Sequence, residues 1–333
     1  MFVHELFRKE TPPKGSVLYG IELEMEGTRL PKVIPGPEWR VEHDGSLRGE
    51  DNAEYVLKKP LSYEDSLKAF GKLVDYIDLV GDDPDPSRRT STHVHVDCRG
   101  LHTEQLITFI VLFLTFEEFL VDWCGEERKG NLFSLQTKDA DGFYVALTGF
   151  LTSGTPQYLS DNIRYSSINL AALGKYGSVE FRSLRGTLDK KVLGTWLSVL
   201  DRLRNLAEVY KNPLEVVYEM SVLGPDGFAA KVLGPHLKTF FKGRGKAQKL
   251  VGGIRRAQDI AFLYEREDVK GFFNKVVGKP FEKVKRNKVV APDHLWIDPQ
   301  QPVPIQVDDL DVRQREAMFN GFVGVRAEVE DGF

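Results

Sequence analysis

The sequence predicts an α+β fold with six short strands and three long helices. Short segments alternate apolar with polar side chains, which is the pattern of strands that bury one face. Elsewhere apolar side chains recur every three or four positions over about twenty residues, as in amphipathic helices. The predicted strands are residues 17–26, 39–47, 52–60, 92–98, 164–173 and 178–184, and the predicted helices are residues 62–80, 103–124 and 189–210.

The first predicted strand carries an unusual set of charges. Residues 19–27 read YGIELEMEG, so every second position is acidic. Because successive side chains of a strand point to opposite faces, one face carries aliphatic residues and the other carries Glu22, Glu24 and Glu26. Like charges this close repel one another unless a cation lies among them. The strand therefore indicates either a solvated surface or a cation site.

The helices are predicted from their caps and their apolar spacing. Ser62 and Asp65 form a capping pair at the start of the helix at 62–80. The helix at 103–124 contains LITFIVLFLTF, an apolar run of eleven residues that is too short to cross a bilayer and predicts a buried helix. Apolar residues on one face predict the helix at 189–210. The GKYG sequence between the last two strands predicts a hairpin turn.

Composition indicates an ordinary globular chain with unevenly distributed charge. The 333 residues have a formal net charge of −4, and the two cysteines, Cys98 and Cys124, suit a reducing compartment. The N-terminus is charged and lacks a signal peptide's apolar core, so we expect a cytoplasmic protein without a membrane partner. Residues 221–290 hold 16 Lys or Arg against 6 Asp or Glu, and residues 291–333 hold 9 acidic residues against 3 Arg.

Side chains with metal-binding chemistry share a face on several predicted strands. The sequence THVHVD places His93 and His95 on one face, which is a common way to present imidazoles to a metal ion. The sequence SVEFRSLR places Glu180 beside Arg182, with Arg185 following, and such a set suits a metal–phosphate site. If the strands lie side by side, they form one acidic surface whose carboxylates would hold divalent cations. Taken singly, each strand is equally consistent with a solvated or ion-paired surface.

Common nucleotide-binding and hydrolase motifs are absent from the sequence. It has no Walker A motif, no GxGxxG, no GxSxG and no HExxH. The GRGK at 243–246 lacks the upstream spacing of a Walker A motif and its following Ser or Thr. A bound nucleotide would therefore be held through metal ions on acidic strands rather than by a phosphate-binding loop.

Six segments in this order resemble the amidoligase family, a branch of the glutamine synthetase and glutamate–cysteine ligase superfamily. They are GIELE (20–24), WRVEHDGSL (39–47), AEYVLKKPL (53–61), THVHVD (92–97), RYSSINLAAL (164–173) and SVEFRSLRGTLD (178–189). The resemblance covers about residues 17–205. It implies a glutamine synthetase-like fold, with a curved, mainly antiparallel sheet, helices on its outer face and an active site on its concave side.

The resemblance also implies an activity, and the change in charge after about residue 215 predicts a division of the chain. The activity is the joining of a carboxylate to an amine through an acyl phosphate, with ATP and Mg²⁺ (or Mn²⁺) as cofactors. The substrates would be small-molecule or peptide carboxylates and amines. Residues 1–215 would form the catalytic domain, and residues 216–333 would form a basic helical region with an acidic, extended tail.

Individual residues take roles from the same resemblance. Arg182 and Arg185 would face the phosphates, and Arg164 would hold a substrate carboxylate or phosphate. Asn169 and Ser46 would bind the nucleotide. The implied metal ligands are Glu22, Glu24, Asp44, Glu54, His93, His95 and Glu180. Three acidic residues do not match the family's pattern and are interpreted as ordinary polar residues: Glu26, Glu42 and Asp97.

Two alternatives remain open. A His-x-His strand also begins the metal site of amidohydrolases, which need further histidines, and only His102, His236 and His294 follow in this sequence. The basic residues 221–290 could instead bind a phosphate backbone, as a nucleic-acid-binding module or as a docking site for a protein or nucleic-acid substrate. Dependence on ATP separates a ligase from an amidohydrolase.

Overall fold

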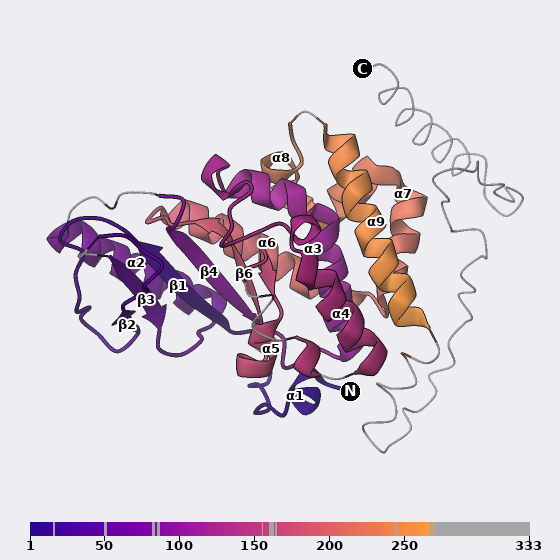
Figure 1. Cartoon of the computed structure of the whole chain (residues 1–333), viewed down its shortest axis with the longest axis horizontal. Helices are drawn as coiled ribbons and strands as arrows, with labels where there is room; N and C mark the ends of the chain where they lie inside the picture. Colours follow the sequence, from indigo (N-terminus) through magenta and orange to yellow (C-terminus); the bar gives the residue numbers. More distant parts are fainter. Residues whose placement is uncertain are drawn as a thin grey trace, which may run out of the picture.

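One antiparallel sheet lies beside a group of helices (Figure 1). The computed structural model describes residues 1–15, 17–49, 52–81, 84, 87–154, 156–159, 163, 165–243, 245–266 and 269. Within these residues the sheet has six strands in the order β2-β3-β1-β4-β6-β5. The strands are β1 (Tyr19–Met25), β2 (Trp39–Glu42), β3 (Ala53–Leu57), β4 (Ser91–Asp97), β5 (Ile168–Asn169) and β6 (Ser178–Arg185). The predicted α+β class is confirmed.

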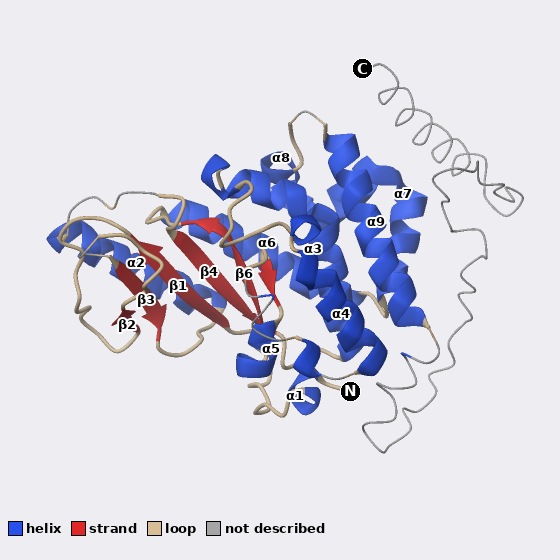
Figure 2. Ribbon diagram, viewed as in Figure 1, coloured by secondary structure: helices blue, strands red, loops and turns tan. Residues whose placement is uncertain are grey.

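Helices cover the sheet and extend beyond it as a helical layer (Figure 2). They are α1 (Val3–Leu6), α2 (Tyr63–Val80), α3 (Thr103–Cys124), α4 (Asp141–Ser153), α5 (Ala171–Tyr176), α6 (Lys190–Val209), α7 (Pro213–Leu233), α8 (Leu237–Phe240) and α9 (Lys246–Glu265). The three predicted helices match α2, α3 and α6 within one residue at each end. As predicted, Ser62 caps α2 by accepting a hydrogen bond from the Asp65 backbone N–H at 3.3 Å. None of the helices in this described part has the length and apolarity to cross a membrane.

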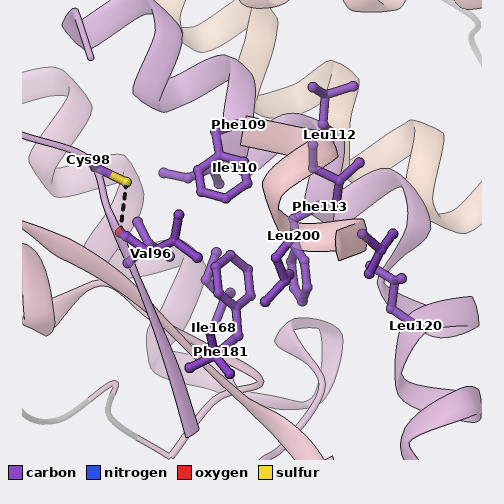
Figure 3. Packing of buried hydrophobic residues seen from close by; sticks show 14 of the residues in the cluster. Val96, Cys98, Phe109, Ile110, Leu112, Phe113, Leu120, Ile168, Phe181 and Leu200 are labelled. Atoms are coloured by element: carbon purple, nitrogen blue, oxygen red, sulfur yellow. Dashed lines mark hydrogen bonds between the residues drawn. The ribbon is translucent and has the colours of Figure 1, made fainter. Parts of the chain in front are cut away.

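The apolar face of the sheet packs against α3. Phe181 of β6 lies between two aromatic rings of this helix, with centroid distances of 5.5 Å to Phe109 and 4.9 Å to Phe113 (Figure 3). All three rings are buried, and each contributes on the order of 2–3 kcal/mol to folding. This packing commits one face of the sheet to the core, so the polar side chains must face the other way.

Several predicted strands are shorter than expected, and the one predicted at 52–60 ends at Leu57. The strand predicted at 164–173 is wrong beyond β5, because residues 171–176 form α5 instead of continuing toward a hairpin. The Asn169 Oδ1 accepts a hydrogen bond from the Ala171 N–H at 2.9 Å, which turns the chain out of the sheet, and Gly177 ends α5 in the left-handed region at φ 74°. The strand predicted at 39–47 ends at Glu42, before a loop.

The helix α9 packs closely along α3. A Cβ added to Gly253 would lie 2.1 Å from the Thr115 carbonyl oxygen, so the close approach of the two helices requires glycine at this position. Residues 246–265 of the predicted basic region therefore pack against the helix that supports the sheet. The rest of the predicted basic region, from residue 270, and the acidic tail lie outside the described residues.

Candidate metal and active site

Antiparallel pairing brings polar residues from distant segments onto one face. Glu22 of β1 lies opposite His93 of β4. His95 lies opposite Glu180 of β6, which in turn lies opposite Asn169 of β5. Because paired residues of neighbouring strands point to the same side, these side chains converge although the sequence separates them widely.

Glycine on β1 makes room for one of the imidazoles. Gly20 lies opposite His95 in the register of β1 and β4. A Cβ at this position would lie 3.2 Å from the Cβ of His95, which is tighter than ordinary contact. The side chain of His95 therefore lies over bare backbone and can turn toward the acidic residues.

Glu22, His95 and Glu180 form the centre of the cluster. One ligand atom from each of them lies within 4.8 Å of the others. The Nδ1 of His95 lies 3.1 Å from the Ser178 hydroxyl, whereas Nε2 is buried and has no hydrogen-bond partner among the described residues. The Glu22 carboxylate lies 3.3 Å from Nε2, but off the hydrogen-bond direction. A bound cation would satisfy this buried nitrogen, which is otherwise costly.

His93 lies beside this centre and has a defined tautomer. The Ser91 hydroxyl donates to Glu24, so it accepts from the Nε2–H of His93, 2.7 Å away. The Nδ1 of His93 then faces Glu22 at 3.3 Å and Glu180 at 3.5 Å. Three electron-rich atoms meet there, and the arrangement needs positive charge among them, which a guanidinium, a proton or a metal ion can supply.

The electrostatics of the centre keep its carboxylates ionised. Burial disfavours the charged form of Glu22, but the neighbouring His93 and His95 outweigh it and hold the pKa of Glu22 well below its ordinary value. Burial likewise opposes ionisation of Glu180, and the Arg182 charge with both imidazoles lowers the pKa of that carboxyl. For His95, burial is outweighed by Glu180 and Glu22, which raise the pKa of the imidazole. The centre therefore attracts positive charge.

A second group of carboxylates continues the cluster toward β3. Glu24 lies opposite Glu54 in the register of β1 and β3, and Asp44 contacts Glu24. The Asp44 carboxylate accepts hydrogen bonds from the Ser46 N–H at 2.7 Å and the Ser46 hydroxyl at 2.9 Å, which holds the loop after β2. Burial, reinforced by the charges of Glu22 and Glu24, raises the pKa of Glu54 to about 8. Without a cation, this end of the cluster relieves its charge by binding a proton.

Arg182 and Asn169 both contact Glu180. The Arg182 Nη1 donates to Glu180 Oε1 at 2.5 Å, and it also lies 3.5 Å from the Nδ1 of His93. The Asn169 Nδ2 donates to Glu180 Oε2 at 2.6 Å. The guanidinium therefore supplies positive charge at the centre, and the amide fixes the orientation of the carboxylate.

An irregularity in the pairing of β4 and β6 decides where the next arginine lies. The register shifts near Val94, which lies opposite Phe181, so β6 has one residue more than β4 over this stretch. Arg185 consequently lies opposite Ser91, on the polar face, although it is three residues from Arg182.

Arg185 lines a cleft of about 560 Å³ at the end of the sheet. Its Nη1 donates to the Cys124 carbonyl oxygen at 3.1 Å, where α3 ends. Arg88 adds a second guanidinium to the cleft, and Glu127 adds a carboxylate. Gly186 also lines it, and a Cβ there would lie 2.9 Å from the backbone oxygen of Glu24, so the cleft adjoins the cluster. Arg164 lies outside the described residues, and its predicted role stays a prediction.

The three acidic residues left out of the predicted site have other partners. Glu26 accepts a hydrogen bond from the Arg48 N–H at 2.6 Å. Glu42 pairs with Arg40 at 2.5 Å on the exposed end of β2. Asp97 accepts two hydrogen bonds from the Arg99 guanidinium, at 2.9 and 2.8 Å: this is an internal ion pair at the end of β4.

Ser91 and Arg128 are among the buried polar residues that support the cluster and were not predicted. Ser91 could have been found, because in STHVHVD it shares a face with His93 by alternation. Arg128 gave no signal, since its segment EERKG resembles a solvated turn. Its guanidinium is buried and donates to the carbonyl oxygens of Arg182 at 2.8 Å and Thr90 at 3.3 Å, which holds the irregular part of β6 against the start of β4.

Comparison of the chain with protein-family models and with curated proteins finds no match. Function is therefore inferred from the cluster itself. It combines ionised carboxylates, a buried imidazole nitrogen without a hydrogen bond, and a guanidinium within 2.5 Å of a candidate ligand. The carboxylate oxygens are typical ligands of Mg²⁺ or Mn²⁺, and the imidazole nitrogens are typical ligands of Zn²⁺ and other transition-metal ions.

Proposed function

We propose that the protein is an ATP-dependent carboxylate–amine ligase of the glutamine synthetase-like type, using Mg²⁺ or Mn²⁺. The observation that carries this proposal is the trio of Glu22, His95 and Glu180, whose ligand atoms lie within 4.8 Å of one another around a buried Nε2 that lacks a hydrogen bond. The resemblance to the amidoligase family supports the same function.

The residues fit a divalent cation at the centre of the cluster. Glu22 is the access point, because its side chain is 23% exposed while that of Glu180 is 6% exposed. Glu24, Asp44 and Glu54 offer further oxygen atoms beside it. When bound, the cation would neutralise charge on the nucleotide's phosphates and on the transferred phosphoryl group.

The chain's own cations would complete the neutralisation. Arg182 is held at the centre by Glu180, and it can donate to a phosphate oxygen once a metal ion takes that carboxylate. Asn169 would keep Glu180 oriented during this exchange, through the hydrogen bond to Oε2. Arg185 and Arg88 in the adjoining cleft would bind an anionic group of the substrate.

The proposed reaction has two group transfers. An oxygen of the substrate carboxylate attacks the γ-phosphorus of ATP, and the bond to the bridging oxygen of ADP breaks. The nitrogen of the amine then attacks the acyl carbon, the bond from that carbon to the phosphate oxygen breaks, and the nitrogen loses a proton. The products are an amide, ADP and phosphate, so most of the catalysis is positioning and charge neutralisation.

The test is an ADP-release assay with Mg²⁺ or Mn²⁺ across a panel of carboxylates and amines. Amide formation should require ATP and both substrates, and it should fall to background in Glu22→Gln and Glu180→Gln. Glu64→Gln is the matched control, because it removes an exposed carboxylate of α2 outside the cluster. If the parent protein fails to bind ATP, or fails to bind Mn²⁺, the ligase proposal is overturned. Hydrolytic activity with Zn²⁺ alone, without ATP, would favour an amidohydrolase.

No contact in the described residues favours nucleic-acid binding over this function. Three lysines of the basic region form ion pairs within the molecule: Lys231 with Glu219, Lys246 with Asp226 at 3.5 Å, and Lys249 with Asp122. Paired lysines offer less charge to a phosphate backbone. A macromolecular substrate docked on residues 221–290 stays a prediction.

A further inference from the structure

Glu117 is a buried carboxylate on α3 that the proposed reaction does not use. It is fully inaccessible to solvent, although α3 is otherwise an apolar core helix. Its Oε1 accepts hydrogen bonds from the Thr137 N–H at 2.7 Å and the Ser167 hydroxyl at 2.5 Å, and its Oε2 accepts from the Thr137 hydroxyl at 2.5 Å. One carboxylate therefore accepts hydrogen bonds from two separate chain segments, one around Thr137 and one around Ser167.

Both of these segments also contact residues of the candidate metal cluster. Ser167 precedes β5, its carbonyl accepts from the Arg182 N–H at 2.9 Å, and two residues later Asn169 binds Glu180. The segment before Thr137 contains Phe133, whose carbonyl oxygen lies 3.5 Å from the Nε of Arg182. Glu117 thus hydrogen-bonds the segments that contact Glu180 and Arg182.

The same carboxylate connects the cluster to the C-terminal helices. The Nη2 of Arg256, on α9, lies 3.9 Å from Glu117 and 3.4 Å from Glu118. The close approach of α9 at Gly253 places this guanidinium beside α3. A continuous series of contacts therefore runs from α9 through Glu117 and Ser167 to the candidate metal ligand Glu180.

We propose that Glu117 is a positioning residue for the metal site, acting through Ser167 and Asn169 on Glu180. The proposal rests on the proposed function, because it assumes that the cluster binds a divalent cation. A carboxylate is needed because three donors converge on two acceptor oxygens, and an apolar residue would leave the Thr137 N–H and the Ser167 hydroxyl buried without this acceptor. Groups that orient a metal ligand from behind typically change metal affinity by about 10- to 100-fold.

The test uses Mn²⁺ alone as the probe, titrated into the full chain and followed by electron paramagnetic resonance. We expect Ser167→Ala, which removes the link to β5, to weaken Mn²⁺ binding by about tenfold or more. Glu117→Gln keeps the size but offers one acceptor oxygen instead of two, and it should weaken binding similarly. Because both variants break one link, the double variant should bind Mn²⁺ about as weakly as either single variant.

The matched control is Thr115→Val, which removes another buried hydroxyl from α3, one that donates to the Val111 carbonyl oxygen. It should lower stability while leaving Mn²⁺ affinity unchanged, and circular dichroism should show that all variants are folded at the titration temperature. Unchanged affinity in Ser167→Ala and Glu117→Gln would overturn the positioning role alone. A parent protein that binds no Mn²⁺ would overturn both this inference and the proposed function.

Discussion

The imidazole of His93 is joined to the carboxylate of Glu24 by the hydroxyl group of Ser91. The hydroxyl donates to Glu24 and lies 2.7 Å from the Nε2 of His93. This chain fixes the tautomer of His93 and aims its other ring nitrogen at Glu22 and Glu180, the candidate metal ligands. The relationship makes the orientation of the cluster depend on one buried serine.

Ser91→Ala should therefore weaken metal binding without removing a metal ligand. The change leaves His93 and Glu24 without their shared partner, so the imidazole can adopt the other tautomer. We expect Mn²⁺ affinity to fall about tenfold, and the unfolding free energy to fall by about 1–3 kcal/mol. Isothermal titration and chemical denaturation measure the two effects. Equal Mn²⁺ affinity in Ser91→Ala and in the parent would contradict the prediction. Ser178→Ala makes the corresponding change beside His95, because it removes the hydroxyl that contacts the Nδ1 of that imidazole.

The cation-free protein should lose stability as the pH rises through the titration range of Glu54. The folded pKa of this carboxyl is about 8, above the ordinary value of 4.5. Between these values the folded chain binds a proton that the unfolded chain has released, so the unfolding free energy falls as the pH rises toward 8. Denaturation at several pH values in the presence of a chelator should show this slope.

Two changes should flatten the slope that Glu54 causes. Glu54→Gln removes the titrating group, and added Mg²⁺ replaces the proton with a cation. Glu64→Gln, which removes an exposed acid on α2 away from Glu54, should leave the slope as it is in the parent. An identical slope in Glu54→Gln and in the parent protein would contradict the assignment of the raised pKa to Glu54.

Arg128→Met should destabilise the fold strongly. The guanidinium is buried and donates to four backbone carbonyl groups, and the shorter apolar side chain would make none of these hydrogen bonds. We expect a loss on the order of 3 kcal/mol, measured by urea denaturation. Arg40→Met removes a half-exposed arginine and should cost less than about 1 kcal/mol. Similar losses in the two variants would show that Arg128 does not hold β6 in place.

Neither cysteine should react in the folded protein. Burial raises the pKa of the Cys98 thiol to about 12, and it raises the pKa of Cys124 as well. The thiol of Cys98 also donates to the Val96 carbonyl oxygen at 3.3 Å (Figure 3). A colorimetric thiol reagent at pH 8 should detect no free thiol in the native chain and two after denaturation. Rapid labelling of the native chain would show that the core around α3 opens readily.

The helices were predictable because their signals are local. Ser62 caps α2 through a residue three positions away, and Asp189 caps α6 through the N–H groups of Lys191 and Val192. The strand predicted at 164–173 failed for a local reason too, since Asn169 uses its own side chain to start a helical turn. Whether residues 170–173 continue the strand or turn into a helix also depends on how the segment packs, and the alternation of residues does not show this.

Sequence alone determined which residues share a strand face, because alternation places Glu22 with Glu24 and His93 with His95 whatever the strands pair with. Tertiary structure decided which of these faces meet and at what level, because register depends on pairing between segments far apart in the chain. It also decided that Arg185 shares the polar face with Arg182, since the extra residue in β6 reverses the alternation expected between them. The buried supports at Glu117 and Arg128 exist only in the folded chain, because their partners are backbone and hydroxyl groups that folding brings together.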